Sequence, residues 1–122
     1  MIKPFLLTLF VTLFFAMFNS QCGEKPGEGD LAKKGYENAK PIIEALEKYR
    51  QEKGDYPKSL PELKPQYLAD IPLDENNQSY KYFQKAETKS YSLSFNYDAS
   101  GIGICKCEYS PDTKKWSCDC RI

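Results

Sequence analysis

The stretch CKCEYSPDTKKWSCDC, residues 105–120, contains four of the five cysteines of this 122-residue chain. The cysteines form two Cys-x-Cys pairs that flank the segment Pro111-Asp-Thr-Lys114. A proline at the second position of a type I turn favours a four-residue hairpin loop at this segment. Because side chains alternate along a strand, such a hairpin would carry all four cysteines on one face of the sheet. The stretch therefore predicts a C-terminal β-hairpin with four neighbouring sulfur atoms.

The register of this hairpin pairs the cysteines directly. Four pairs of facing residues have matching chemistry, and these are Cys105 with Cys120, Cys107 with Cys118, Tyr109 with Trp116 and Lys106 with Asp119. Facing residues that are not hydrogen-bonded have a Cα separation that suits a disulfide. We therefore predict two disulfides in this register. The outer one closes a loop of about sixteen residues, which stabilises a fold by about 3 kcal/mol.

Two other uses of the four cysteines stay open at this point. Two Cys-x-Cys arms could converge on a zinc ion, although structural zinc sites more often place two to four residues between the cysteines of a pair. A thiol-disulfide exchange role would require a reactive, accessible thiolate. Export to an oxidising compartment would favour the disulfides over both alternatives.

Residues 1–21 have the layout of an export signal, because Lys3 precedes an apolar run from Phe5 to Phe18. The run is shorter than the roughly 17–25 residues of a transmembrane helix. Cys22 follows directly, where bacterial lipoprotein signals are cleaved and the cysteine is acylated, and without it the number of cysteines is even. We expect a lipid anchor on Cys22, then a flexible tether over residues 22–30 that is rich in glycine and charge.

This arrangement predicts a place in the bacterial cell envelope, attached to the membrane and facing the periplasm or the cell surface. Gly23 follows the cysteine, whereas Asp at that position retains lipoproteins in the inner membrane of enteric bacteria. The outer membrane is therefore favoured. An uncleaved segment 1–21 that anchors the chain is the alternative.

Composition excludes several classes of activity. The chain has no histidine, which removes catalytic systems based on Ser-His-Asp or Cys-His and all histidine-ligated metal sites. It has 17 basic and 17 acidic residues, a balance that argues against nucleic-acid binding. An oxygen-rich segment could suggest calcium, but a polar turn explains its residues more simply, and they are Asp70, Asp74, Glu75, Asn76 and Asn77. We expect no enzyme, no cofactor and no resident metal.

Residues 31–122 are expected to form one domain, which begins with an amphipathic helix within Leu31–Lys53. Its apolar positions recur at three- and four-residue steps, and they are Tyr36, Ala39, Ile42, Ile43, Leu46 and Tyr49. Gly54 suits a left-handed cap at the end of the helix. Pro41 interrupts the pattern, and we expect a shorter helix in which Asn38 is the cap and Pro41 lies in the first turn.

The rest of the domain has the pattern of a proline-rich loop followed by strands. A short helical turn is predicted at Leu60–Leu63, within a segment interrupted by prolines. Residues 79–84 and 90–97 have strand patterns, and the second alternates strictly between large apolar and small or polar side chains.

Several segments occur in an order that resembles a known family. They are Pro41-Ile-Ile-Glu-Ala-Leu46, Gly54-Asp-Tyr-Pro57, Tyr67-Leu68, Ile71-Pro72-Leu-Asp74 and Tyr80-Lys-Tyr82. In this order they resemble the globular domain of the major pseudopilin of type II secretion systems, over about residues 36–101. The resemblance implies an α+β, pilin-like fold in which a helix packs across a small antiparallel sheet. It also implies that Tyr56 and Pro57 turn the chain back onto the helix.

The resemblance carries a scaffold more reliably than an activity. Residues 1–21 lack the Gly-Phe processing site and the following Glu of pseudopilins, and Gly and Pro residues separate them from the predicted helix. We therefore expect an exported, lipid-anchored structural or binding domain without catalytic activity, with the membrane and envelope or secretion-system proteins as partners. The alternatives are a minor membrane-anchored component of a type II secretion or type IV pilus-like system, and an envelope thiol-redox or metal-binding protein that uses the Cys-x-Cys pairs.

Overall fold

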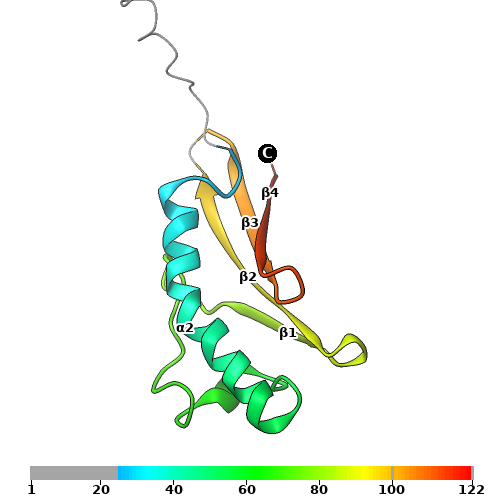
Figure 1. The fold of residues 1–122 in the computed structure, drawn as a ribbon. Coiled ribbons are helices and arrows are strands. Elements are labelled where there is room, and N and C mark those ends of the chain that lie inside the picture. Colours follow the sequence, from blue (N-terminus) through cyan, green and yellow to red (C-terminus); the bar gives the residue numbers. More distant parts are fainter. Residues whose placement is uncertain (1–24, 100, 122) are drawn as a thin grey trace, which may run out of the picture.

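The computed structural model describes residues 25–99 and 101–121, in which one α-helix packs across a four-stranded antiparallel sheet (Figure 1). The order along the sheet is β1-β2-β3-β4. The elements are α2 (Asp30–Lys53), the 3-10 turns η1 (Leu60–Leu63) and η2 (Ala86–Thr88), and the strands β1 (Lys81–Lys85), β2 (Ser90–Ala99), β3 (Gly103–Ser110) and β4 (Lys115–Arg121). The α+β prediction is confirmed at this level.

Helix α2 is longer than expected, because it continues through Pro41. The shorter helix capped by Asn38 is therefore wrong. A proline inside a helix costs about 3 kcal/mol, mainly through a lost hydrogen bond and a clash with the preceding turn. Pro41 and Glu37, whose carbonyl loses its donor, are both exposed, so water can reach that carbonyl. Burial of Ala32 and Gly35 against the sheet offsets the cost and holds the first turns in place.

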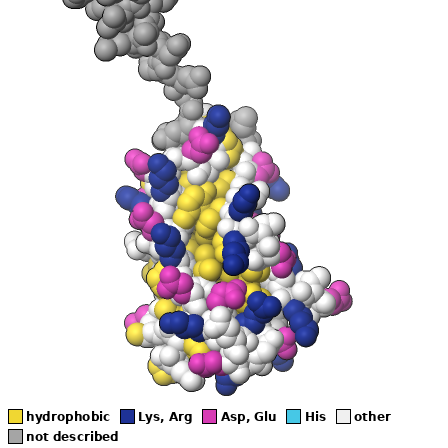
Figure 2. Space-filling view, viewed as in Figure 1, with side chains coloured by type: hydrophobic (Ala, Val, Ile, Leu, Met, Phe, Trp, Pro, Cys, Tyr) yellow, Lys and Arg dark blue, Asp and Glu magenta, His cyan; other side chains and the backbone are white. Residues whose placement is uncertain are grey.

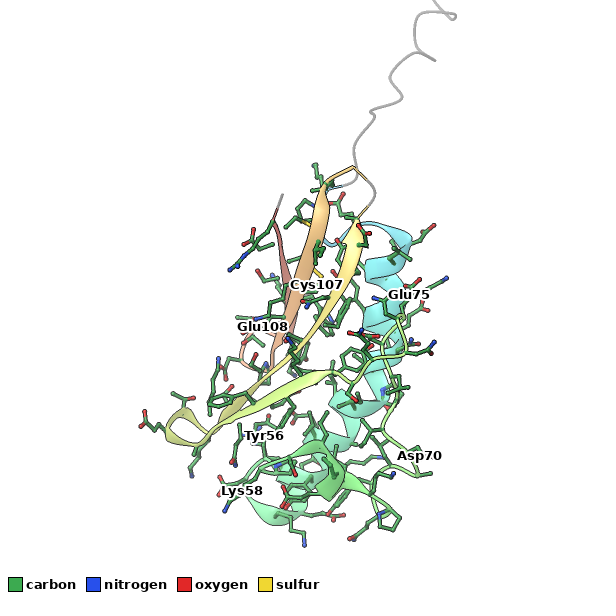
Figure 3. The ribbon with its side chains drawn as sticks, turned by 180° about the vertical axis from the view of Figure 1, so that it is seen from behind. Tyr56, Lys58, Asp70, Glu75, Cys107 and Glu108 are labelled. Atoms are coloured by element: carbon green, nitrogen blue, oxygen red, sulfur yellow. A yellow bond between two sulfur atoms is a disulfide. The ribbon has the colours of Figure 1, made fainter. Side chains whose placement is uncertain are left out.

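The end of α2 and the proline-rich segment form as the sequence predicts. Gly54 has a left-handed conformation (φ 88°), and its amide donates to the carbonyl of Arg50. Leu60–Leu63 is a 3-10 turn that buries Leu60 and Leu63, and Ser59 and Glu62 form a capping box at its start. This segment lies at the opposite end of the molecule from the start of α2 (Figures 1 and 3).

The two faces of the sheet differ in polarity because side chains alternate along each strand. On β2 the inner face carries Tyr91, Leu93, Phe95 and Tyr97, all buried under α2. The outer face of β2 carries Ser92, Ser94, Asn96 and Asp98. The helix makes its sheet contacts mainly with β2, so β3 and β4 extend beyond it.

The predicted C-terminal hairpin is confirmed in its loop and in every pair. Strands β3 and β4 are joined by Pro111–Lys114, and the facing pairs include Cys105 with Cys120, Cys107 with Cys118, Tyr109 with Trp116 and Lys106 with Asp119. Both predicted disulfides are present, with Cα separations of 3.9 and 4.1 Å. Strand β4 ends at the same end of the molecule where α2 begins (Figure 1).

The close approach of α2 to β2 generates a first prediction. A Cβ atom added at Gly35 would overlap the ring of Phe95. We expect Gly35→Ala to lower the free energy of unfolding by about 1 kcal/mol, because the overpacking costs about 1–3 kcal/mol and the helix-propensity gain of about 1 kcal/mol offsets only part of that cost.

Urea unfolding measures this change, and Asn38→Ala on the exposed face of the same helix is the control. The control should be neutral or slightly stabilising. A Gly35→Ala protein as stable as the wild type would show that helix and sheet are not in tight contact at this point.

Candidate functional site

An apolar strip lies on the inner face of the sheet where α2 does not cover it. We define the strip as Tyr36 of α2 with Tyr109, Trp116, Cys118 and Cys120 of the hairpin, all of which are partly buried. Figure 2 shows an apolar surface running between the helix and the hairpin, with basic side chains along both margins. Aromatic side chains at a partly wet surface are typical of recognition sites.

The aromatic rings of the strip continue the core instead of standing apart from it. The ring of Tyr36 lies 4.9 Å from that of Trp116, and Trp116 lies 5.3 Å from both Phe95 and Tyr109. Tyr109 is stacked on buried Tyr91 at 6.3 Å. The strip is therefore held by rings that are themselves fixed, which limits the entropy that its side chains would lose on binding a partner.

The inner disulfide forms the floor of the strip beneath Tyr36. The Tyr36 hydroxyl oxygen lies 3.0 Å from Cys118 Sγ and 3.6 Å from Cys107 Sγ. Cys105 and Cys107 are wholly buried, whereas their partners on β4 are partly buried. Figure 3 labels Cys107 on the sheet, beside β2. Because the sulfur atoms are bonded to each other, they act here as cross-links between β3 and β4 and not as thiolate ligands of zinc.

Residues 25–29, which precede α2, pack beside Tyr36 and the inner disulfide. The Tyr36 hydroxyl donates to the Gly27 carbonyl at 3.0 Å, and the Gly27 amide donates to the Tyr97 hydroxyl at 2.8 Å. Gly27 has a left-handed conformation (φ 83°), and a Cβ atom there would come within 2.8 Å of Cys118 Sγ, so only glycine fits. The described part of the expected tether, residues 25–29, is thus docked on the domain. Cys22, the predicted lipidation site, lies outside the described residues.

The oxygen-rich segment is organised as a turn. Asp74 is buried, and its Oδ1 accepts hydrogen bonds from the amides of Asn76 and Gln78 at 2.9 and 2.8 Å. Asp70 lies apart and pairs with Lys64 at 2.9 Å. Within residues 25–99 and 101–121, no group of three or more acidic, cysteine or histidine side chains is placed to hold a metal ion.

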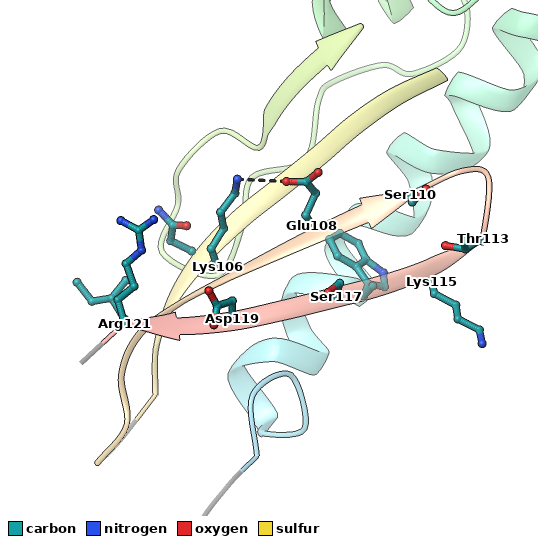
Figure 4. A pocket seen from close by; sticks show the side chains of 11 residues that line it. Lys106, Glu108, Ser110, Thr113, Lys115, Ser117, Asp119 and Arg121 are labelled. Atoms are coloured by element: carbon teal, nitrogen blue, oxygen red, sulfur yellow. Dashed lines mark hydrogen bonds and ion pairs between the residues drawn. The ribbon is translucent and has the colours of Figure 1, made fainter. Parts of the chain in front are cut away.

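The outer face of the hairpin carries an open hollow lined by charged and polar side chains together with Ile104 and Trp116 (Figure 4). Lys106 faces Asp119 in the register, as predicted, but its ammonium group pairs with Glu108 on the same strand at 3.2 Å. Burial alone would raise the pKa of Glu108, but hydrogen bonds from Lys106 and Ser92 outweigh it and lower the pKa. All these side chains are at least partly exposed, so the hollow is a solvated surface with little binding energy of its own.

Two contacts that position the strip had no signal in the sequence. The Tyr80 hydroxyl donates to the Gly35 carbonyl at 2.6 Å, and the Gly27 amide donates to the Tyr97 hydroxyl across seventy positions of the chain.

Comparison with protein families, with curated proteins and with solved structures finds no match for this chain. No helix within the described residues is both long and apolar enough to cross a membrane.

Removing the Tyr36 hydroxyl tests the docking of residues 25–29. In Tyr36→Phe the Gly27 carbonyl loses its donor, and a hydrogen bond is worth about 1 kcal/mol. We expect hydrogen exchange at the Gly27 amide to become about fivefold faster, since this energy corresponds to a factor of about five in population. Tyr49→Phe, which alters a partly buried ring on the same helix, is the control. Unchanged protection at Gly27 would contradict the proposed anchoring contact.

The buried tyrosines predict how stability depends on alkaline pH. Burial and the hydrogen bond to Glu47 raise the pKa of Tyr56 to about 12, and burial raises the pKa values of Tyr80, Tyr82 and Tyr91 further. In the unfolded chain these groups lose protons near pH 10, so the unfolded state is favoured as pH rises above about 10. Stability should be independent of these groups below that pH and fall above it.

Absorbance at 295 nm during an alkaline titration checks this behaviour. These four tyrosines should ionise well above pH 10, together with loss of the fold. If all nine tyrosines titrated in one transition near pH 10 while the circular dichroism stayed native, the described burial would be wrong.

Proposed function

We propose that this protein is an exported, lipid-anchored domain of the bacterial cell envelope with a structural or binding role and without catalytic activity. The docked segment 25–29 is the observation that carries the proposal. Cys22 lies three positions before Lys25 in the sequence, and three residues span at most about 10 Å. An acylated Cys22 would therefore hold the domain close to the membrane surface.

The shape of the domain supports a fixed orientation on the membrane. The docked segment, the start of α2 and the end of β4 lie at one end of the molecule, and the proline-rich segment lies at the other (Figure 1). Helix α2 has 24 residues, which gives a length of about 36 Å. The end that carries η1 would then project away from the bilayer. The part of the apolar strip that lies beside the start of α2 and the end of β4 would remain near the bilayer.

The use of the polar side chains supports a scaffold and not a catalyst. The hydroxyl groups of Tyr56 and Tyr82 donate to Glu47 and to the Pro57 carbonyl, both at 2.6 Å, and so join the helix, the proline-rich segment and β1. These groups hold the elements together. Tyr56 also lines a small hollow beside β1, but its hydroxyl is engaged by Glu47. Catalytic groups usually lie in such a hollow, with pKa values matched to proton transfer.

We also propose that the domain is pilin-like. Tyr56 and Pro57 are buried directly after the end of α2, which agrees with the role that the resemblance to pseudopilins assigns to them. The alternative is a minor component of a type II secretion or type IV pilus-like system that keeps residues 1–21 as its membrane anchor. The two proposals differ in what happens at Cys22.

The intact mass of the protein extracted from its native membrane without reductant tests the anchor. We expect a chain cleaved before Cys22 that carries acyl groups, and a gain of about four mass units when both disulfides are reduced. Cys22→Ser should abolish acylation and leave the precursor uncleaved. A full-length, unlipidated wild-type mass would overturn the lipoprotein proposal and favour the secretion-machine component.

A further inference from the structure

Strand β4 has one edge paired with β3 and one edge that no described residue covers. The disulfide-bonded pairs have Cα separations of 3.9 and 4.1 Å, which identifies them as positions without mutual backbone hydrogen bonds. In an antiparallel pair, such residues direct their N–H and C=O groups to the opposite side. Trp116, Cys118 and Cys120 therefore present backbone donors and acceptors at the free edge of β4.

These groups find no backbone partner among residues 25–99 and 101–121. An open row of N–H and C=O groups is a template for a further strand, and proteins usually blunt it with charges, a proline or a bulge. Strand β4 has seven residues, no proline and a regular pairing with β3. The free edge of β4 can therefore pair with a further extended strand.

The charge pattern of β4 identifies which strand fits. Its outer face carries Lys115, Ser117, Asp119 and Arg121, and its inner face carries the apolar residues of the strip. We propose that β4 pairs with β4 of a second copy of this chain, antiparallel and centred on Ser117. In this register Lys115 faces the partner's Asp119, and Asp119 faces the partner's Lys115. Two opposite-charge pairs then flank one two-fold axis.

The neighbouring registers are less favourable. The outward groups belong to every second residue, so the register can move only in steps that keep those residues paired. Centring on Cys118 would place Lys115 against the partner's Arg121. Centring on Asp119 would place Asp119 against the partner's Asp119. Centring on Trp116 would leave Lys115 and Asp119 without opposite charges. Ser117 is thus the self-complementary centre.

The other edge of the sheet, strand β1, has a charge pattern that does not complement itself. Strand β1 carries Lys81, Phe83 and Lys85 on its exposed outer face, with no acidic residue in the strand, and Lys89 follows the next turn. Antiparallel pairing of β1 with its own copy, centred on Phe83, would place Lys81 against the partner's Lys85, which is destabilising. The contrast between a blunted edge at β1 and a complementary edge at β4 supports self-association through β4.

Pairing through β4 would also extend the apolar strip. A two-fold axis perpendicular to the sheet keeps both inner faces on the same side, so Trp116 would lie beside the partner's Cys118. The two helices would then flank a continuous apolar floor made from both hairpins. Trp116 is the single tryptophan of the chain and is partly exposed, so its fluorescence would report its further burial.

Two charge-reversal variants test the register. The full chain is purified with its disulfides intact and studied by sedimentation from about 1 µM to about 1 mM. The wild type should form a concentration-dependent dimer with a blue shift of Trp116 fluorescence. Lys115→Glu and Asp119→Lys should each weaken the dimer at least about tenfold, because each turns both charge pairs into repulsions.

Mixing the two variants provides the decisive result. A heterodimer of Lys115→Glu with Asp119→Lys has opposite charges at both positions, so dimerisation should return to about the wild-type level. Lys48→Glu, an equal charge change on the exposed face of α2, should dimerise like the wild type. A wild type that stays monomeric, or a dimer that neither variant weakens, would overturn the proposal and direct attention to another strand or another surface.

A cross-link gives a readout that is independent of affinity. Ser117 is exposed on the outer face and would face its own copy at the two-fold axis. Ser117→Cys should form an intermolecular disulfide within the dimer, whereas Thr113→Cys in the exposed loop should do so much more slowly. Equal rates for the two variants would contradict the register even if a dimer forms.

Discussion

The contact between the Phe95 ring and the backbone of α2 at Gly35 sets the arrangement of the whole domain. With no Cβ at this position, the helix lies close enough to β2 for the Tyr80 hydroxyl to reach the Gly35 carbonyl. The next residue, Tyr36, is then placed over Trp116 and the inner disulfide. The close approach at one glycine thus determines the spacing of the two layers and the position of the apolar strip.

The hairpin compensates for a helix that is too narrow to cover four strands. Helix α2 buries the inner face of β2, but β4 lies two strands further along the sheet. A strand in that position gains little burial, and the two disulfides hold it in its place. The covalent links hold β4 without a further covering element, so within residues 25–99 and 101–121 the strip stays partly exposed and the outer edge of β4 unpaired.

The parts predicted correctly from sequence depend on local rules. The hairpin register follows from strand alternation and a four-residue loop, and Gly54 follows from the conformation of a helix end. The predicted helix start is wrong because the packing of Gly35 on Phe95, which outweighs the local cost of Pro41, joins residues that are distant in the sequence. The docking of Gly27 on Tyr36 and Tyr97, and the pairing of Lys106 with Glu108 instead of Asp119, depend on three-dimensional distances that no spacing in the sequence encodes.

Both cross-links of this domain join neighbouring strands near the end of the chain, and this matters for how it would bear mechanical load. The disulfide between Cys105 and Cys120 spans 15 positions. If the described chain were pulled between Lys25 and Arg121, the residues between the two cysteines would not lengthen it, which removes about 50 Å from the fully stretched contour. The force would instead act on the noncovalent pairing of β2 with β3 and on the hydrogen bonds at Gly27, so these contacts would yield first while the hairpin kept its shape.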